Sequence, residues 1–285
     1  MGRFFLSGHL SGDPLPSTPP EVLLRAAASK GLPSSVLYYL KENPTIDVNQ
    51  GDDMNFTALC GACTAGHDRV VAILLAHPAI DVNTAKSGSF PFLCAVASGR
   101  MACFRLLLKD SRVKVNEPFE TGGTVLSCAA STGQLEIIKV WIASGREMDV
   151  GHPADPDSDA IAAARKEGKT EVATLLERFQ ENPEETRHWM RIETGWYNER
   201  AAEIFALVVF VADGLLLCAA NTAPRRFIAR LFRSERSPAA RFFAIATQLP
   251  LELQMVLCYR ALGSGRDNVP GDASELAFRV LAKKI

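Results

Sequence analysis

Apolar residues recur along this chain with the spacing of a helix face, and a glycine interrupts them at a nearly constant distance. Gly31, Gly66, Gly99, Gly133 and Gly168 are separated by 35, 33, 34 and 35 residues. A run of small apolar residues precedes each glycine. The run that follows has apolar positions three and four residues apart, as on one face of a helix. Each period therefore predicts two helices joined by a glycine in a left-handed turn.

The same unit is repeated five times. Its copies cover residues 22–49, 56–83, 89–116, 123–150 and 159–179. Between the copies, equivalent turn positions carry Asn55, Gly88, Gly122 and Asp157, which are residue types that tolerate positive φ. A period of this length predicts a solenoid, in which each helix–turn–helix unit packs on its neighbours.

The best-preserved copy, residues 56–83, reads FTALCGACTAGHDRVVAILLAHPAIDVN. It resembles the ankyrin repeat, whose consensus starts T-P-L-H, continues A-A-x-x-G-H into an apolar helix and ends D-V-N. The resemblance covers residues 20–180 and implies an all-α solenoid with short hairpins. The copies depart from the consensus at its His, where this chain has Cys60, Leu93 and Ser127.

Three domains follow from this pattern. Residues 1–19 are predicted to be a disordered N-terminal segment, because Ser11–Pro20 is rich in proline and serine. Residues 20–180 form the repeat domain of five units. Residues 181–285 are predicted to form a helical C-terminal domain, for which the chain length leaves room.

The most apolar segment, Ala201–Ala220, allows two interpretations. One is a membrane span, and the other is a buried helix at the centre of the C-terminal domain. Glu203 and Asp213 interrupt the run, and neither uncharged stretch is long enough to cross a bilayer. We therefore expect a buried helix and no membrane span.

An arginine-rich segment follows at Arg225–Arg241, with six arginines and one glutamate. Phe227, Ile228, Leu231 and Phe232 would share one face of a helix there. The segment fits a solvated basic face on a packed helix. A patch for a membrane surface, for nuclear import or for an acidic partner is the alternative.

The composition argues against further classes of function. The net charge of −1 provides no overall field that would favour nucleic acid. Of the seven cysteines, five fall at core positions of the repeats: Cys60, Cys63, Cys94, Cys103 and Cys128. The lone C-x-x-C lacks a second pair or a nearby His, so we expect no metal site. Free thiols favour a reducing compartment, which is the cytoplasm with the nucleus as an alternative.

The sequence also lacks the motifs of common catalytic sites. It contains no G-x-G-x-x-G after a strand, no G-x-x-x-x-G-K-[ST] and no H-E-x-x-H. Its five histidines are scattered, and none groups with a nucleophile and a second base. We therefore predict a protein without enzymatic activity and without a cofactor.

The ankyrin resemblance implies recognition of a protein partner, which the sequence does not identify. Its contacts would lie on hairpin tips and on the exposed ends of the first helices. The tip candidates are Asp53, Met54, Phe56, Lys86, Ser87, Ser89, Glu120 and Thr121. The helix candidates are Thr64, Ala65, Ala97, Ser98, Ser131 and Thr132.

The C-terminal region contains one more motif, Leu249-Pro250-Leu251-Glu252, followed by an apolar helix. It weakly resembles an F-box, and the C-terminal region as a whole resembles that of fungal ankyrin proteins. An F-box implies docking on a ubiquitin-ligase scaffold, which would make the chain a substrate-recognition adaptor. The alternatives are a structural helix of the C-terminal domain and a self-docked structural protein.

Overall fold

The computed structural model describes residues 18–83, 90–119, 122–152, 157–212, 245–246, 249–262 and 269–282. Within these ranges the regular elements are all α-helices, which confirms the predicted class. The chain divides into two compact units, Met1–Arg187 and His188–Ile285. Of the predicted N-terminal segment, residues 1–17 lie outside the described residues, and the first helix begins at Pro20.

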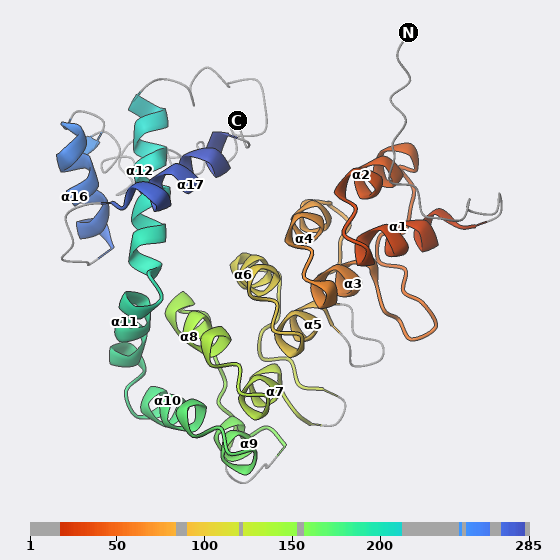
Figure 1. Ribbon diagram of the computed structural model, residues 1–285, viewed down its shortest axis with the longest axis horizontal. Helices are drawn as coiled ribbons and strands as arrows, with labels where there is room; N and C mark the ends of the chain where they lie inside the picture. Colours follow the sequence, from red (N-terminus) through yellow and green to blue (C-terminus); the bar gives the residue numbers. More distant parts are fainter. Residues whose placement is uncertain are drawn as a thin grey trace. The chain divides into compact units, whose positions relative to one another are not determined.

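The first unit is built from five helix pairs. The first helices of the pairs are α1 (Pro20–Ser29), α3 (Ala58–Ala65), α5 (Pro91–Ala97), α7 (Val125–Ser131) and α9 (Ala160–Lys166). The second helices are α2 (Pro33–Glu42), α4 (Asp68–Leu75), α6 (Met101–Lys109), α8 (Leu135–Ser144) and α10 (Thr170–Glu181). Each first helix packs on the next first helix, and each second helix packs on the next second helix. The unit is therefore a solenoid of two helical layers (Figure 1).

The glycine between the helices of each pair has two structural roles. Gly31 and Gly66 adopt φ values of 65° and 86°, in the left-handed region that disfavours other residues. A side chain of the following repeat also lies close to each of these glycines. A Cβ on Gly31 would lie 2.4 Å from Nδ1 of His67, and a Cβ on Gly66 would lie 2.9 Å from Cδ of Arg100. Glycine is thus needed both for the turn and for the close approach of the next repeat.

The core of this unit lies between the two layers, and its central part is aromatic. Phe92 from α5, Phe104 from α6 and Trp141 from α8 are fully buried. The ring centroids of Phe92 and Phe104 are 5.4 Å apart, and those of Phe92 and Trp141 are 5.1 Å apart. Offset or edge-to-face aromatic pairs add to the free energy of burial. Three helices from two consecutive repeats are joined in this way.

A row of asparagines joins the tails that close the repeats. The side-chain amide of Asn49 donates to the carbonyl of Ala79 at 2.7 Å and accepts from the N–H of Asp81 at 2.8 Å. Asn83 makes the same two bonds to the next tail, at 2.8 and 2.8 Å. Asn116 accepts a bond of 3.1 Å from the tail after that. One side chain per repeat thus satisfies the backbone of its neighbour and fixes the register of stacking.

Arginines cap the C-terminal ends of second helices in the preceding repeat. Arg112 donates to the carbonyl of Leu75, the last residue of α4, at 2.8 Å. Arg112 also pairs with Asp110 at 2.6 Å, and this hydrogen bond lowers the pKa of the Asp110 carboxyl. Arg146 donates to the carbonyls of Asp110 and Val113, just beyond α6, at 2.9 and 2.5 Å. Positive charge at a helix C-terminus is stabilising, because it complements the helix dipole.

The second unit packs around one apolar helix. Helix α11 (Pro183–Glu193) crosses the boundary between the units, and α12 (Trp196–Ala212), α16 (Leu251–Ala261) and α17 (Gly271–Ala282) follow. Both α16 and α17 pack on α12. Their shared core includes Ala201, Phe205, Val208 and Cys258. The prediction of a buried helix is thereby confirmed for residues 201–208.

Two predicted segments of this unit are not fully described. Residues 213–220 of the apolar run lie outside the described residues, and so does the arginine-rich segment 225–241. Among the residues that the structure does describe, none of the helices combines the length and the apolar character needed to cross a bilayer.

Leu107→Ala in α6 is expected to destabilise the first unit strongly, because Leu107 is fully buried. Loss of its side chain leaves a cavity that costs about 2–5 kcal/mol. Leu37→Ala in α2 is the matched control, since Leu37 is 53% exposed and its loss should cost below about 1 kcal/mol. Urea unfolding of both variants measures the difference. Equal losses would show that our assignment of the core face is wrong.

The two roles of the repeat glycine can be separated by Gly31→Ala and Gly168→Ala. Both residues have positive φ, but only Gly31 lies under a side chain of the next repeat, and a Cβ at Gly168 would meet nothing within 4 Å. Gly168→Ala should cost about 1–2 kcal/mol, which is the backbone term alone. Gly31→Ala should cost more, because the His67 ring must move. The measurement is the free energy of unfolding of each variant. Equal losses would show that the close approach of His67 to Gly31 does not contribute to stability.

Candidate partner-binding surface

Two of the helices that carry predicted contacts, α3 and α7, begin at side-chain caps. Thr57 is the N-cap of α3, and its Oγ1 accepts a hydrogen bond of 3.2 Å from the N–H of Cys60. Thr124 and Ser127 form a reciprocal capping box at the start of α7, with bonds of 3.0 and 3.1 Å. Caps of this kind satisfy N–H groups that a helix cannot pair internally. The caps therefore fix where α3 and α7 begin.

The hairpin before α3 holds one large apolar side chain in solvent. The Asp52 carboxylate accepts from the N–H groups of Met54 and Phe56 at 3.0 and 2.9 Å, and Asn55 adopts a φ of 55°. Met54 is 75% exposed at the tip, Asp53 is exposed beside it, and Phe56 is half-buried. Asn55 thus has the positive φ that its position predicts, and the turn presents Met54 outward.

The ends of the first helices form a row of small side chains. Among the predicted contacts, Thr64, Ala97 and Thr132 are exposed, whereas Ala65, Ser98 and Ser131 are half-buried. Because α3, α5 and α7 lie side by side, these residues come together from successive repeats (Figure 1). The remaining tip candidates lie outside the described residues: Lys86, Ser87, Ser89, Glu120 and Thr121.

Two features of this row were not predicted from the sequence. The hydroxyls of Ser131 and Thr132 both donate to the carbonyl of Cys128, at 3.0 and 2.7 Å, so these donors are engaged within their own helix. Arg100 is exposed beside Thr64 and donates to its carbonyl at 3.0 Å, which brings a positive charge to the row. The signal in the sequence was the position of Arg100, which follows its glycine as His67 follows Gly66.

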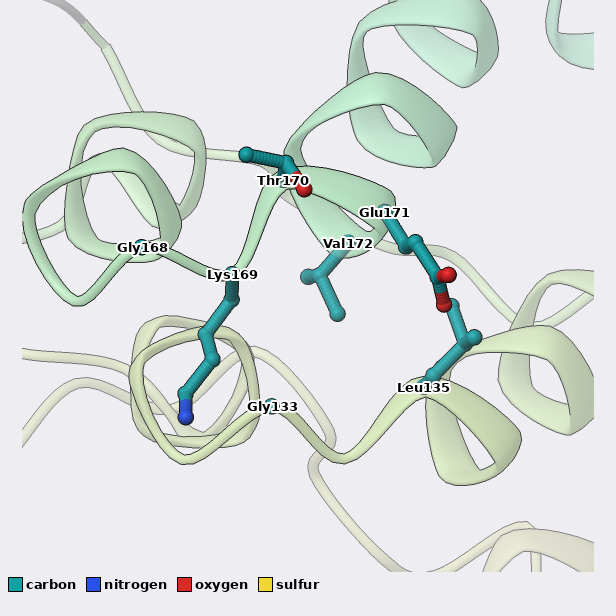
Figure 2. Close-up of a pocket in the computed structure, with 7 residues that line it drawn as sticks. All are labelled: Gly133, Leu135, Gly168, Lys169, Thr170, Glu171 and Val172. Atoms are coloured by element: carbon teal, nitrogen blue, oxygen red, sulfur yellow. The ribbon is translucent and has the colours of Figure 1, made fainter.

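A small hollow of about 220 Å³ lies elsewhere, at the turns of the last two helix pairs. Figure 2 shows its lining, which runs from Gly133 and Leu135 to residues 168–172. Lys169 and Glu171 are the charged residues of that lining, and their side chains point apart. The hollow therefore presents no paired groups for acid–base chemistry.

The cysteines of the repeats mostly behave as core residues, as the sequence predicts. The structure buries four of them: Cys60, Cys63, Cys94 and Cys103. Cys128 is half-buried instead, because it lies on the same stripe of α7 as Ser131 and Thr132. Burial raises the pKa of the Cys128 thiol. In the described part of the chain, no three ligating side chains gather in a way that could hold a metal ion.

In the second unit, the predicted docking motif lies at the start of α16. Pro250 is the N-cap, and Leu249 before it is half-buried. Leu251 and Leu253 are 52% and 51% exposed, and Glu252 between them is exposed as well. Leu251 and Leu253 are thus turned outward, while α16 packs on α12 through residues further along the helix, including Cys258.

Comparison with known proteins agrees with this architecture. Residues 23–118 match the family model for ankyrin repeats, in three copies. The human protein transient receptor potential cation channel subfamily A member 1 is 30% identical over 129 residues. That match covers 43% of this chain but 12% of the human protein, so the chain is similar to a small part of it. Together with the paired helices, the match shows that the chain contains ankyrin repeats, which are generally protein-binding modules.

Proposed function

We propose that this chain is a non-catalytic recognition scaffold that binds a protein partner through its repeats. The recognition surface comprises the tip residues Asp53, Met54 and Phe56 together with the helix ends Thr64, Ala65, Ala97, Ser98, Ser131 and Thr132. The observation that carries the proposal is Met54, which is 75% exposed at the tip of a tightly hydrogen-bonded turn. A methionine held outward on a fixed turn can contact a partner without rearrangement of the backbone.

The chemistry of the surface supports a protein partner. Methionine is an adaptable apolar anchor that can fill irregular pockets of a partner. The small side chains of Thr64 and Ala97 leave room for a partner backbone to approach the helices. Because packed repeats fix these residues in advance, little conformational entropy would be lost on binding. Among the described residues, Asp52 and Asp53 bring negative charge to the tip, and Arg100 brings a positive charge beside Thr64.

Ala97→Arg tests the recognition surface, because it places a bulky charge in the middle of the row. Ala72→Arg is the matched control, since Ala72 is equally an exposed alanine but lies on α4 in the other layer. Partners captured by the tagged full chain are identified by mass spectrometry, and each variant is then tested for the same proteins. Ala97→Arg should lower capture at least about tenfold, which corresponds to 1.4 kcal/mol, whereas Ala72→Arg should retain it. Equal capture by both variants would refute this location of the surface.

The second candidate function is that of a substrate-recognition adaptor of a ubiquitin ligase, with the F-box-like motif as its docking element. Exposure of Leu251 and Leu253 favours it, because a purely internal helix would bury both leucines. Glu252 between them is exposed as well. The repeats would then hold the substrate, while residues 249–252 dock on the ligase scaffold.

The double variant Leu251→Ser/Leu253→Ser is expected to abolish capture of a ligase scaffold subunit and to leave the melting temperature nearly unchanged. The control is Leu276→Ser/Val280→Ser in α17, where the side chains are 63% and 46% exposed. Co-purification followed by immunoblotting for scaffold subunits provides the measurement. Absence of a scaffold subunit from the unmodified chain, or full retention by the double variant, would rule the adaptor function out.

The compartment that best suits this function is the cytoplasm, with the nucleus as the alternative. The six described cysteines are free thiols, which is typical of a reducing compartment.

A further inference from the structure

Helix α17 of the second unit exposes two large apolar side chains. Leu276 is 63% exposed, and Val280 is 46% exposed. Because they are four residues apart, they lie one turn from each other on the same side of the helix. The packed side of α17 is a different one, since Ala277 and Phe278 lie against the core that the helix shares with α12. The helix thus has a covered apolar face and a second apolar stripe, Leu276 and Val280, that solvent reaches.

Charges of opposite sign lie at the two ends of this stripe. Asp272 is in the first turn of α17 and Arg279 is in the last turn, and both are exposed. At about 3.6 residues per turn, both lie on the side of the helix that carries the stripe. Glu275 is also exposed and pairs with Arg279 at 2.5 Å. The helix surface is therefore acidic in its first half and basic towards its end.

A second copy of α17 in the antiparallel orientation complements this surface. When Leu276 of one copy faces Val280 of the other, the two-fold axis repeats the same contact, so both stripes are covered at once. In that alignment Arg279 is offset from Glu275 of the second copy by about 3 Å along the helix axis, within reach of a long side chain. A parallel pairing would instead bring like charges together, which is unfavourable.

We propose that two copies of this chain associate through α17 as an antiparallel helix pair, with Leu276 and Val280 at its centre. Burial of these side chains supplies the favourable free energy, and the exposed charges select the orientation. The helix has 12 residues and is about 18 Å long, so the contact is smaller than a standard protein interface. The dimer is therefore expected to be weak and to dissociate on dilution.

This self-association is independent of the functions proposed above. The stripe on α17 includes neither the repeat residues of the recognition surface nor residues 249–252 of the docking motif. Loss of the dimer would therefore leave binding of a single partner site unchanged, and either proposal can fail without the other. If both hold, the dimer carries two recognition surfaces, and a partner with two binding sites is held more tightly than by one chain.

Sedimentation of the unmodified full chain tests the proposal directly. Between about 1 and 500 µM, a range that covers weak interfaces, the average mass should rise from that of one chain towards that of two. A mass that stays at one chain throughout would overturn the proposal, and would show that the stripe is left for another segment of the chain or for a different protein. Growth beyond two chains would overturn it as well, because a two-fold pairing is closed.

The location of the contact is tested with Leu276→Ser/Val280→Ser. This variant should remain a single chain over the same range of concentrations. The matched control is Leu37→Ser/Tyr38→Ser in α2, which removes two side chains of similar exposure, 53% and 56%, from the first unit. The control should dimerise like the unmodified chain. A dimer that survives the change in α17, or that is lost in the α2 control, would refute this location.

The orientation is tested by exchanging the charges. Arg279→Glu makes the outer side of α17 wholly acidic, and Asp272→Lys/Glu275→Lys makes it wholly basic. Each variant alone should need at least about tenfold more protein to dimerise, because like charges then meet. An equimolar mixture of the two should recover the association as a mixed dimer. Unchanged dimerisation of either variant alone, or a mixture without recovery, would contradict the antiparallel pairing.

Discussion

The close approach of each repeat to the glycine of the one before is the constraint on which the first unit depends. His67 lies over Gly31 and hydrogen-bonds to the carbonyl of Ser29 at 3.2 Å. Arg100 lies over Gly66 and donates to the carbonyl of Thr64 at 3.0 Å. A Cβ at Gly31 or Gly66 would come too close to the His67 ring or the Arg100 side chain, which would have to shift. The asparagine row and the arginine caps join the same neighbouring repeats.

Burial of apolar side chains stabilises the stack of repeats, and polar hydrogen bonds set its register. Burial of Phe92, Phe104 and Trp141 supplies a large favourable free energy, but it specifies register poorly because it is non-directional. Asn49 and Asn83 specify register, since their amide bonds fit only one alignment of neighbouring tails. The indole N–H of Trp141 is buried without a partner in the described structure, at a cost of about 1–3 kcal/mol. The aromatic contacts of the ring offset that cost.

The close spacing of neighbouring repeats affects both the stability of the solenoid and the surface proposed for recognition. Close stacking of the first helices requires small residues, and cysteine is a small apolar residue that meets this need. Cys60 on α3 and Cys94 on α5 are both buried in this packing. At the ends of these helices, the same preference leaves the small exposed side chains of Thr64 and Ala97. The proposed recognition surface thus lies on the layer of first helices.

The sequence by itself determined the paired helices, the left-handed glycines and the burial of most repeat cysteines, because these follow from periodicity and local backbone chemistry. Only the tertiary structure decided that the Thr132 hydroxyl bonds within its own helix and that Arg100 lies beside Thr64. It also decided the outward direction of Leu251, which a short motif does not specify. Each of these features depends on the orientation of a helix about its axis and on contacts between residues far apart in the sequence. The repeat period of the sequence determines neither.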